Sequence, residues 1–450
     1  MMLQLGLATR DITPTRPAMI QGQKRVRIGH DALDPITVTA WALVDEEDAT
    51  ATVFVSCDLA TPSDGLYRAV RAALRGTDVP ADAIVLAATH THTSLVLEDD
   101  FYEYPGGEVM TGAECETWVA GRIVEAVLEA WQSRRTRVLA RAFGHAVVGH
   151  NRYAVYAGGA GQMYGKTRRD DFEHIGGYED HGIDLMFAWE PDGTLVGVAA
   201  VIPCPSQVTE NLEQFSADYW HEVRTELRSR LGAELSVLGL CAAAGDQSPH
   251  FLLYGEQEEE MRQRRGLNER EEIGHRVADA VQRALACTPP PPTAQPCLLV
   301  HEIQRLELSP RKISRAERDQ AQDLYLESAA QGDTSTWWPV RQKAVVEVFD
   351  GERQATPVPA EIHVIRLGDW VIATNPFELF LDYGLQIKAR STAAQTMVVQ
   401  LAGRGFYLPS ARAVAAGGYG AMPAVSVAGP EAGAELVAAT LAMIDGLFAD

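Results

Sequence analysis

The amino-acid sequence predicts an α/β fold with a large mixed or parallel sheet flanked by helices and an active site at the carboxyl ends of strands. Short apolar runs such as residues 84–88 are typical of strands covered on both faces. They alternate along the chain with segments whose apolar residues recur at helical spacing. Several runs end abruptly in polar side chains, and sites in α/β sheets form where strands end.

The first third of the chain predicts three strands followed by a strand–helix–strand unit. The strands are expected at residues 3–14, 35–44 and 52–57. A cap residue, a proline and an acid at residues 61–64 predict a helix start, and Gly76 follows its end near residue 75. Because a right-handed crossover joins parallel strands, the strands before and after this helix should pair in parallel.

The remainder continues the alternation of strands and helices. Trp118, Ile123, Val127 and Trp131 predict a core-facing helix after a capping box at residues 111–114. A long connection over residues 147–180, rich in Gly, Tyr, Arg and Asp, is of a kind that is usually functional or mobile. The later elements expected are strands at 195–202 and 235–240, a helix whose apolar face carries Leu212, Phe215, Tyr219, Val223 and Leu227, helices at 268–287, from about 314, at 379–388 and at 432–448, a hairpin around 368–369, and a strand at 397–401.

Composition narrows the class of protein. The chain has 450 residues, of which 46% are hydrophobic, and we expect one domain over residues 1–450 with an internal boundary near 288–295, where prolines cluster. The net charge of −22 argues against nucleic acid and anionic membrane surfaces as partners. With no leader or membrane-spanning pattern and no Cys-x-x-Cys pair, a cytoplasmic protein is expected, acting on a small-molecule substrate; a homo-oligomer is left open.

The centre of the predicted site is the histidine pair that follows the strand at 84–88. His90 and His92 lie two residues apart, so on an extended chain both imidazoles would point the same way and could share one metal ion. The simpler interpretation is a pair of hydrogen-bonded histidines at the sheet edge, since short motifs often match by chance. Other strands also end in metal-capable or nucleophilic groups, which favours the site.

Taken together, the motifs at residues 11–14, 88–94, 151–152, 245–249 and 406–409 resemble the neutral, non-lysosomal ceramidase family. Members of this family are zinc amidohydrolases with a large α/β catalytic domain. The resemblance implies a Zn²⁺ cofactor bound by His90, Glu378 and Tyr407. It also implies catalytic roles for Ser248, His92, Arg152 and Tyr419.

The chain departs from the family pattern at two places. The family supplies a second zinc histidine at the end of the strand that here ends at residues 202–207, where no histidine stands. His92 is the first candidate to complete the ligand set, and the metal could also have been lost. The other candidates are Cys204, Glu210, His150, His174, His181 and His250. We also expect no C-terminal β-sandwich domain, which argues against a long-chain lipid substrate.

The expected function is a zinc-dependent hydrolase that cleaves an amide or ester bond in a small polar substrate. The sequence leaves open whether Ser248 or a water molecule is the nucleophile. The alternatives are a lyase or carbohydrate-active enzyme on the same metal scaffold, or a binding protein that has lost catalysis. Lys166, Arg168 and Arg169 could receive an anionic substrate or form a solvated surface run.

Overall fold

The computed structural model describes residues 2–47, 49–290, 298–332 and 336–449. Its main sheets have eight strands, in the order β15-β14-β13-β8-β1-β4-β5-β6, and four strands, in the order β17-β18-β19-β21. Both contain parallel and antiparallel pairs, so the predicted mixed α/β fold is confirmed. The boundary expected near 288–295 falls mostly on residues 291–297, outside the described part of the chain.

The chain uses one order of elements three times. A strand is followed by an antiparallel hairpin, a helix, a strand parallel to the second hairpin strand, and a closing helix. Unit 1 comprises β1 (Met2–Asp11), β4 (Thr37–Asp45), β5 (Thr50–Cys57), α1 (Asp64–Leu74), β6 (Ile84–Ala88) and α2 (Gly112–Gln132). Unit 2 comprises β8 (Arg135–His145), β13 (Gly182–Trp189), β14 (Leu195–Ile202), α3 (Tyr219–Leu231), β15 (Ser236–Cys241) and α5 (Glu269–Ala286). Unit 3 comprises β17 (Leu299–Leu308), β18 (Val358–Leu367), β19 (Trp370–Thr374), α8 (Leu381–Arg390), β21 (Gln395–Val399) and α10 (Pro430–Phe448).

The remaining elements lie in the connections of these units. Between the first and second strands are β2 (Ala18–Gln21) and β3 (Ile28–Gly29) in unit 1, β9 (His150–Asn151), β10 (Tyr153–Tyr156), β11 (Gly161–Met163) and β12 (Phe172–Ile175) in unit 2, and α6 (Arg315–Ala330) and α7 (Trp337–Phe349) in unit 3. Elsewhere are η1 (Ala81–Ala83), β7 (Ser94–Leu95), β16 (Gln247–Ser248), α4 (Gly255–Arg265), β20 (Glu378–Leu379), β22 (Tyr407–Leu408), α9 (Ala411–Ala416) and η2 (Tyr419–Ala421).

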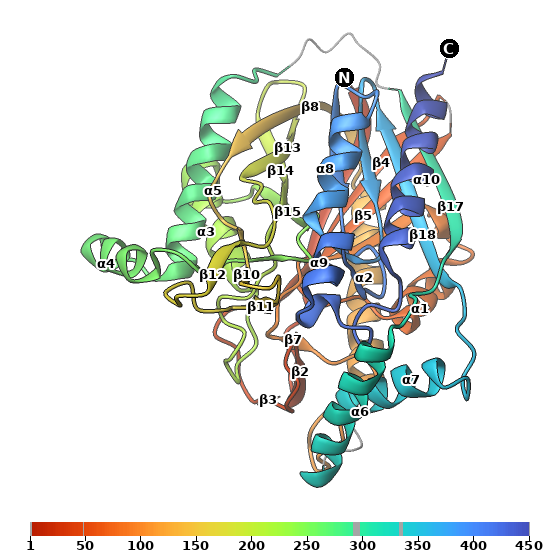
Figure 1. Ribbon diagram of the computed structural model, residues 1–450. Helices are drawn as coiled ribbons and strands as arrows, with labels where there is room; N and C mark the ends of the chain where they lie inside the picture. The colour runs from red at the N-terminus through yellow and green to blue at the C-terminus, as the bar shows by residue number, and fades with distance from the viewer. Residues whose placement is uncertain (1, 48, 291–297, 333–335, 450) are drawn as a thin grey trace.

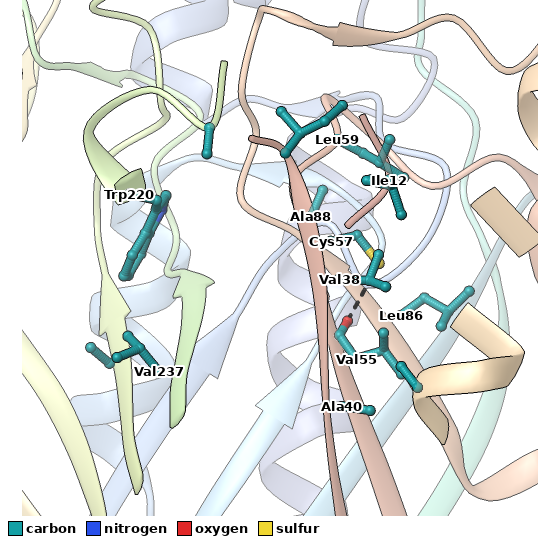
Figure 2. Packing of buried hydrophobic residues seen from close by; sticks show 14 of the residues in the cluster. Ile12, Val38, Ala40, Val55, Cys57, Leu59, Leu86, Ala88, Trp220 and Val237 are labelled. Atoms are coloured by element: carbon teal, nitrogen blue, oxygen red, sulfur yellow. Dashed lines mark hydrogen bonds between the residues drawn. The ribbon is translucent and has the colours of Figure 1, made fainter. Parts of the chain in front are cut away.

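The three largest apolar clusters of the described residues fill the space between the layers. Because side chains alternate across a strand, Val38 and Ala40 of β4 pack with the helices of units 1 and 2, whereas Trp41 and Leu43 face the four-stranded sheet. Helices α8 and α10 cover the other face of that smaller sheet (Figure 1). Figure 2 shows part of the helix-side core, including the hydrogen bond from the Cys57 thiol to the carbonyl oxygen of Val55. Burial on both faces explains the nearly continuous apolar runs in the sequence.

The carboxyl ends of the last strands of the three units are joined by backbone hydrogen bonds. Ala88 N–H of unit 1 donates to Leu401 O of unit 3 (3.2 Å), and Gln400 N–H donates to Cys241 O of unit 2 (3.0 Å). A third hydrogen bond, from His92 N–H of unit 1 to Ser206 O of unit 2 (3.2 Å), joins the remaining pair of units. The eight-stranded sheet can deliver both of its edges to one place because twist accumulates from strand to strand. The predicted meeting of strand ends is therefore observed.

Helix boundaries agree with the capping signals in the sequence. Ser63 caps α1, and capping boxes begin α2 at Thr111 and α5 at Asn268. The predicted β5–β6 parallel pair and the β18–β19 hairpin are confirmed. One helix was predicted to start too early: α3 begins only at Tyr219, so Leu212 and Phe215 lie in the preceding loop. The carboxylate of Asp218 explains this, since it binds Thr209 N–H and Tyr219 N–H and holds the loop ahead of the helix.

The described residues contain no helix with the length and apolar character needed to cross a bilayer.

Candidate functional site

The two histidines lie in the loop that follows β6. His90 has a φ of 61°, so the extended conformation expected across the pair is wrong. The turn still brings the rings together, with His90 Nε2 and His92 Nε2 3.4 Å apart and the ring centroids separated by 4.8 Å. Gly22 allows this packing, because a Cβ at that position would lie 2.5 Å from the His92 side chain.

Glu378 and Tyr407 come to the same place from unit 3. They are register partners in the short parallel pair β20–β22. Glu378 Oε2 lies 3.2 Å from His90 Nε2, and the Tyr407 hydroxyl also hydrogen bonds to this carboxylate. The structure therefore brings together three of the predicted metal ligands, although 288 residues separate His90 from Glu378.

Burial and hydrogen bonding set the charge states of these groups. Burial acts to raise the pKa of Glu378, but its contacts with His90 and with the Tyr407 hydroxyl outweigh it, and the net pKa is lowered. Burial holds the pKa of His92 well below its usual range and that of Tyr407 well above it. These directions leave Glu378 ionised, His92 neutral and Tyr407 protonated.

Arg152 lies behind Tyr407 and holds it in position. Its guanidinium donates to the Tyr407 hydroxyl (3.1 Å) and to Gly245 O (2.8 Å), and its side chain is buried. Burial works against the charge of Arg152, but the neighbouring tyrosines outweigh it and the net pKa is raised. Arg152 is absent from the described residues that line the cleft beside the histidines, and its predicted contact with substrate stays a prediction.

Ser248 is fully buried at the β9–β16 contact, where it pairs with His150. Its Oγ accepts hydrogen bonds from the Tyr164 hydroxyl (3.1 Å) and from His250 N–H (3.2 Å). It too is missing from the described cleft lining, so its role as nucleophile stays a prediction.

Glu210 joins the histidine pair to the serine segment. Its carboxylate lies 3.6 Å from His92 Nδ1 and 3.3 Å from His250 Nε2. Burial would lower the pKa of His250, but the Glu210 carboxylate outweighs it and the pKa is raised. Gln207 completes this group, with its Nε2 3.1 Å from His92 Nε2. The segment after β14 has no histidine where the family has one, but it contacts His92 through the amide of Gln207 and the carboxylate of Glu210.

The other candidates for the missing ligand lie in different surroundings. Cys204 is buried in the apolar core, and burial raises the pKa of its thiol well above the usual range, which disfavours a thiolate. His150 and His181 both contact Glu179, at 3.5 and 3.4 Å. His174 is exposed and its Nδ1 contacts Ile175 O. His92, Glu210 and His250 are the candidates that contact the group around His90.

A cleft opens over the histidines, with about 690 Å³ of empty space, part of it open to solvent. Tyr419 lines it, with its ring stacked on Trp338 (6.0 Å between centroids) and edge-on to Tyr407 (5.8 Å). Burial raises the pKa of the Tyr419 hydroxyl, which stays protonated. The other lining residues are Gln21, Gly22, Gln23, Ala60, Thr61, His90, His92, Glu98, Phe101, Trp337, Arg341, Glu378, Arg404, Gly405, Phe406, Tyr407 and Val425.

The geometry around His90 suits a zinc ion. Ligand atoms on a tetrahedron with 2.0–2.1 Å bonds lie about 3.3 Å apart, close to the 3.2 Å found between His90 Nε2 and Glu378 Oε2. His90 Nδ1 lies 2.6 Å from Ala60 O, which places the proton on Nδ1 and leaves Nε2 free as a ligand. Within the described residues, no group of three or more His, Cys, Asp and Glu side chains forms a metal cluster. A site at this place therefore needs the phenol of Tyr407.

Comparison with known proteins matches the whole architecture to solved structures. No protein-family model and no curated protein sequence matches the chain. Among solved structures, the neutral ceramidase from Pseudomonas aeruginosa superposes with a TM-score of 0.71 at 15% identity, covering 99% of this chain and 74% of that one. A ceramidase complexed with C2 gives a TM-score of 0.70 at 14% identity, covering 99% and 75%. The chain has the neutral ceramidase fold. The resemblance in the motifs is thus confirmed at the level of fold.

Sequence reasoning about this ceramidase fold missed several residues beside the site. Gln207 was named only as part of a strand end, and Tyr164 only as part of the long connection. Arg341 was missed because α7 was not predicted. The cations that the sequence did suggest lie on the surface, where Arg168 pairs with Glu256 and Arg169 with Asp171. Only the accumulation of Gly and Tyr at 147–180 pointed toward Tyr164.

Proposed function

We propose that this chain is a zinc-dependent hydrolase that cleaves an amide or ester bond in a small polar substrate. The observation that supports it most is the meeting of His90, Glu378 and Tyr407 at one end of a cleft, with His92 in contact with His90. Nitrogen and oxygen donors of this kind are ligands that zinc accepts, and three protein ligands leave a position for chemistry. The ceramidase fold is consistent with the proposal.

Zinc held by His90, Glu378 and Tyr407 would supply a Lewis acid for the scissile carbonyl group. The chain provides the remaining functions. His92, kept neutral by burial, can accept a proton in the cleft, and Glu210 is placed to stabilise the charge that His92 gains. Arg152 keeps Tyr407 oriented toward Glu378, and Tyr419 presents its hydroxyl as a donor for a substrate oxygen.

The character of the cleft supports a polar substrate. Glu98, Arg341 and Arg404 line it together with amide and imidazole groups. A long acyl chain needs an apolar wall, because each methylene left in water forgoes about 0.8 kcal/mol of transfer free energy. Among the described residues, these charged side chains interrupt the aromatic part of the lining, so we expect ceramide to be a poor substrate.

The experiment that tests this proposal is a turnover screen with zinc present. Ceramide-like lipids are compared with small polar amides and esters and with uronic and amino sugars. We expect hydrolysis of a polar amide or ester, reversible loss of it on chelation, and little turnover of lipid. High turnover of ceramide with every polar compound inert would contradict the substrate class, and zinc-free protein without turnover would favour a binding protein.

Replacing Ser248 with alanine tests the nucleophile. If Ser248 attacks the carbonyl, Ser248→Ala should keep fold and zinc content but lower kcat at least about a hundredfold, the usual scale for one catalytic group. Tyr164→Phe removes the hydroxyl that bonds to Ser248 Oγ and to Arg152, and it should have a smaller effect because Ser248 itself remains. Ser133→Ala, at the exposed end of α2, serves as the control. Unchanged turnover in Ser248→Ala would assign attack to water.

A further inference from the structure

Within the described residues, the cleft contains an arginine that has no hydrogen-bond or ion-pair partner. Arg341 lies in α7 and is half-buried in the cleft wall. Its guanidinium carbon lies 5.1 Å from the ring centroid of Trp337 and 4.9 Å from that of Phe406. Among the residues that the structure describes, none forms a hydrogen bond or an ion pair with this guanidinium.

The neighbouring arginines differ because each has an oxygen partner. Arg404 forms an ion pair with Glu98 (3.3 Å). Arg152 donates to Tyr407 and Gly245, as described above. Arg27 donates to three backbone carbonyl oxygens, one of them that of His92. Arg341 therefore keeps its full hydrogen-bonding capacity within the cleft.

Holding this cation without a partner has a physical cost. Burial lowers the pKa of Arg341, and the charge of Arg404 lowers it further. Acids are not scarce, since the chain has 61 Asp and Glu against 39 Lys and Arg. The partly buried guanidinium of Arg341 has lost water without gaining an acidic partner among the described residues. An anionic ligand that binds it would offset this desolvation cost. Lys24 adds a second positive charge beside the cleft, with its ammonium 3.4 Å from the ring centroid of Trp338 and 5.0 Å from that of Tyr419.

Arg341 lies in the same cleft as the residues proposed to act on the substrate. Arg341 lines the same cleft as His90, Glu378 and Tyr419, so one small molecule can contact all of them. We propose that Arg341 is a specificity-determining residue, and that it binds a carboxylate carried by the substrate away from the bond that is cleaved. The statement that a bond is cleaved rests on the proposed function. The carboxylate site itself does not.

A carboxylate fits Arg341 better than a more highly charged group. The planar guanidinium matches the two oxygens of a carboxylate, and the rings of Trp337 and Phe406 restrict its orientation. Only one carboxylate of a molecule needs to meet Arg341, whereas phosphate gathers its two charges on one group and would call for a second guanidinium beside Arg341. Arg404 and Arg152 are already engaged.

Binding of simple probes to the full-length protein tests the carboxylate site without catalysis. Glutarate, its neutral diamide and inorganic phosphate are titrated by calorimetry into wild type, Arg341→Gln, Arg341→Lys and the surface control Arg168→Gln. We expect glutarate to bind wild type and the control, to bind Arg341→Gln at least about tenfold more weakly, and to bind Arg341→Lys at an intermediate level. Circular dichroism and thermal midpoints verify that each variant folds.

The outcomes separate this inference from the proposed function. Equal glutarate affinity in wild type and Arg341→Gln, or binding of phosphate but not of glutarate, would overturn the carboxylate assignment. Loss of glutarate binding in Arg341→Gln supports the site even when the turnover screen finds no substrate. When it does find one, Arg341→Gln should raise KM at least about tenfold for the substrate that carries a carboxylate and leave its neutral amide counterpart unchanged.

Discussion

The His90→Ala protein is expected to contain no stoichiometric zinc and to lose at least about a thousandfold in turnover. His90 contacts both Glu378 and His92, so its removal takes away the group that holds the set together. A weakened metal site forfeits the Lewis acid on which neutral-pH hydrolysis would depend. Elemental analysis of the purified protein gives the metal content, and steady-state kinetics on a substrate from the screen gives the turnover.

The control for this change is His174→Ala, since His174 is an exposed histidine outside the site. His90→Asn is a second variant, because asparagine tolerates the positive φ of this position better than alanine does. Thermal midpoints should show that the variants fold. Wild-type zinc content in both His90 variants would contradict the ligand assignment.

The Arg224→Met protein is expected to be less stable than wild type by about 3–5 kcal/mol. Arg224 of α3 forms two hydrogen bonds to the Asp58 carboxylate (2.7 and 2.9 Å), and both side chains are buried. Removing Arg224 leaves the buried Asp58 carboxylate without a cationic partner, which is the costly case, although Thr37 and Thr89 still donate hydrogen bonds to it. Because Asp58 follows β5 of unit 1, the pair also ties unit 1 to unit 2. The denaturation midpoint in urea, compared at equal slope, measures the change.

Arg230→Met is the matched control for this prediction. Arg230 lies on the same helix and contacts Glu226, Asp279, Gln282 and His275, but it is only partly buried, so its removal should cost less than removal of Arg224. Combining Arg224→Met with Asp58→Asn should recover part of the loss, because the uncompensated charge is gone. Equal urea midpoints for Arg224→Met and Arg230→Met would show that the buried Arg224–Asp58 pair contributes no more to the free energy of unfolding than the contacts of Arg230.

The regular elements of the fold were predictable because their signals are local. The side chains of Ser63 and Thr111 accept hydrogen bonds from backbone N–H groups three residues further on. Both partners therefore lie within one short stretch of sequence. The start of α3 was not predictable in this way. Leu212 and Phe215 continue a helical spacing, but Asp218 binds Thr209 and Asp34 binds Ala217, and these contacts hold the segment in a loop.

The residues that meet at the site were predictable, whereas their surroundings were not. His90, Glu378 and Tyr407 each follow a strand, and strand ends meet by the rules of sheet topology. Contacts such as Gln207 with His92 depend on side-chain positions across 115 residues, and no periodicity in the sequence encodes them. The sequence gives no sign of Arg341 either, because its proposed role rests on its having no hydrogen-bond or ion-pair partner among the described residues.

The threefold use of one element order has a consequence for how the site can change. The units share a plan of strands and helices but contribute different chemical groups: unit 1 contributes the imidazoles of His90 and His92, and unit 3 contributes the carboxylate of Glu378 and the phenol of Tyr407. The connections between first and second strands reach the same cleft through Gln21 and Arg341. Substitutions in these connections can therefore alter the cleft wall while the strands that carry the other groups stay unchanged.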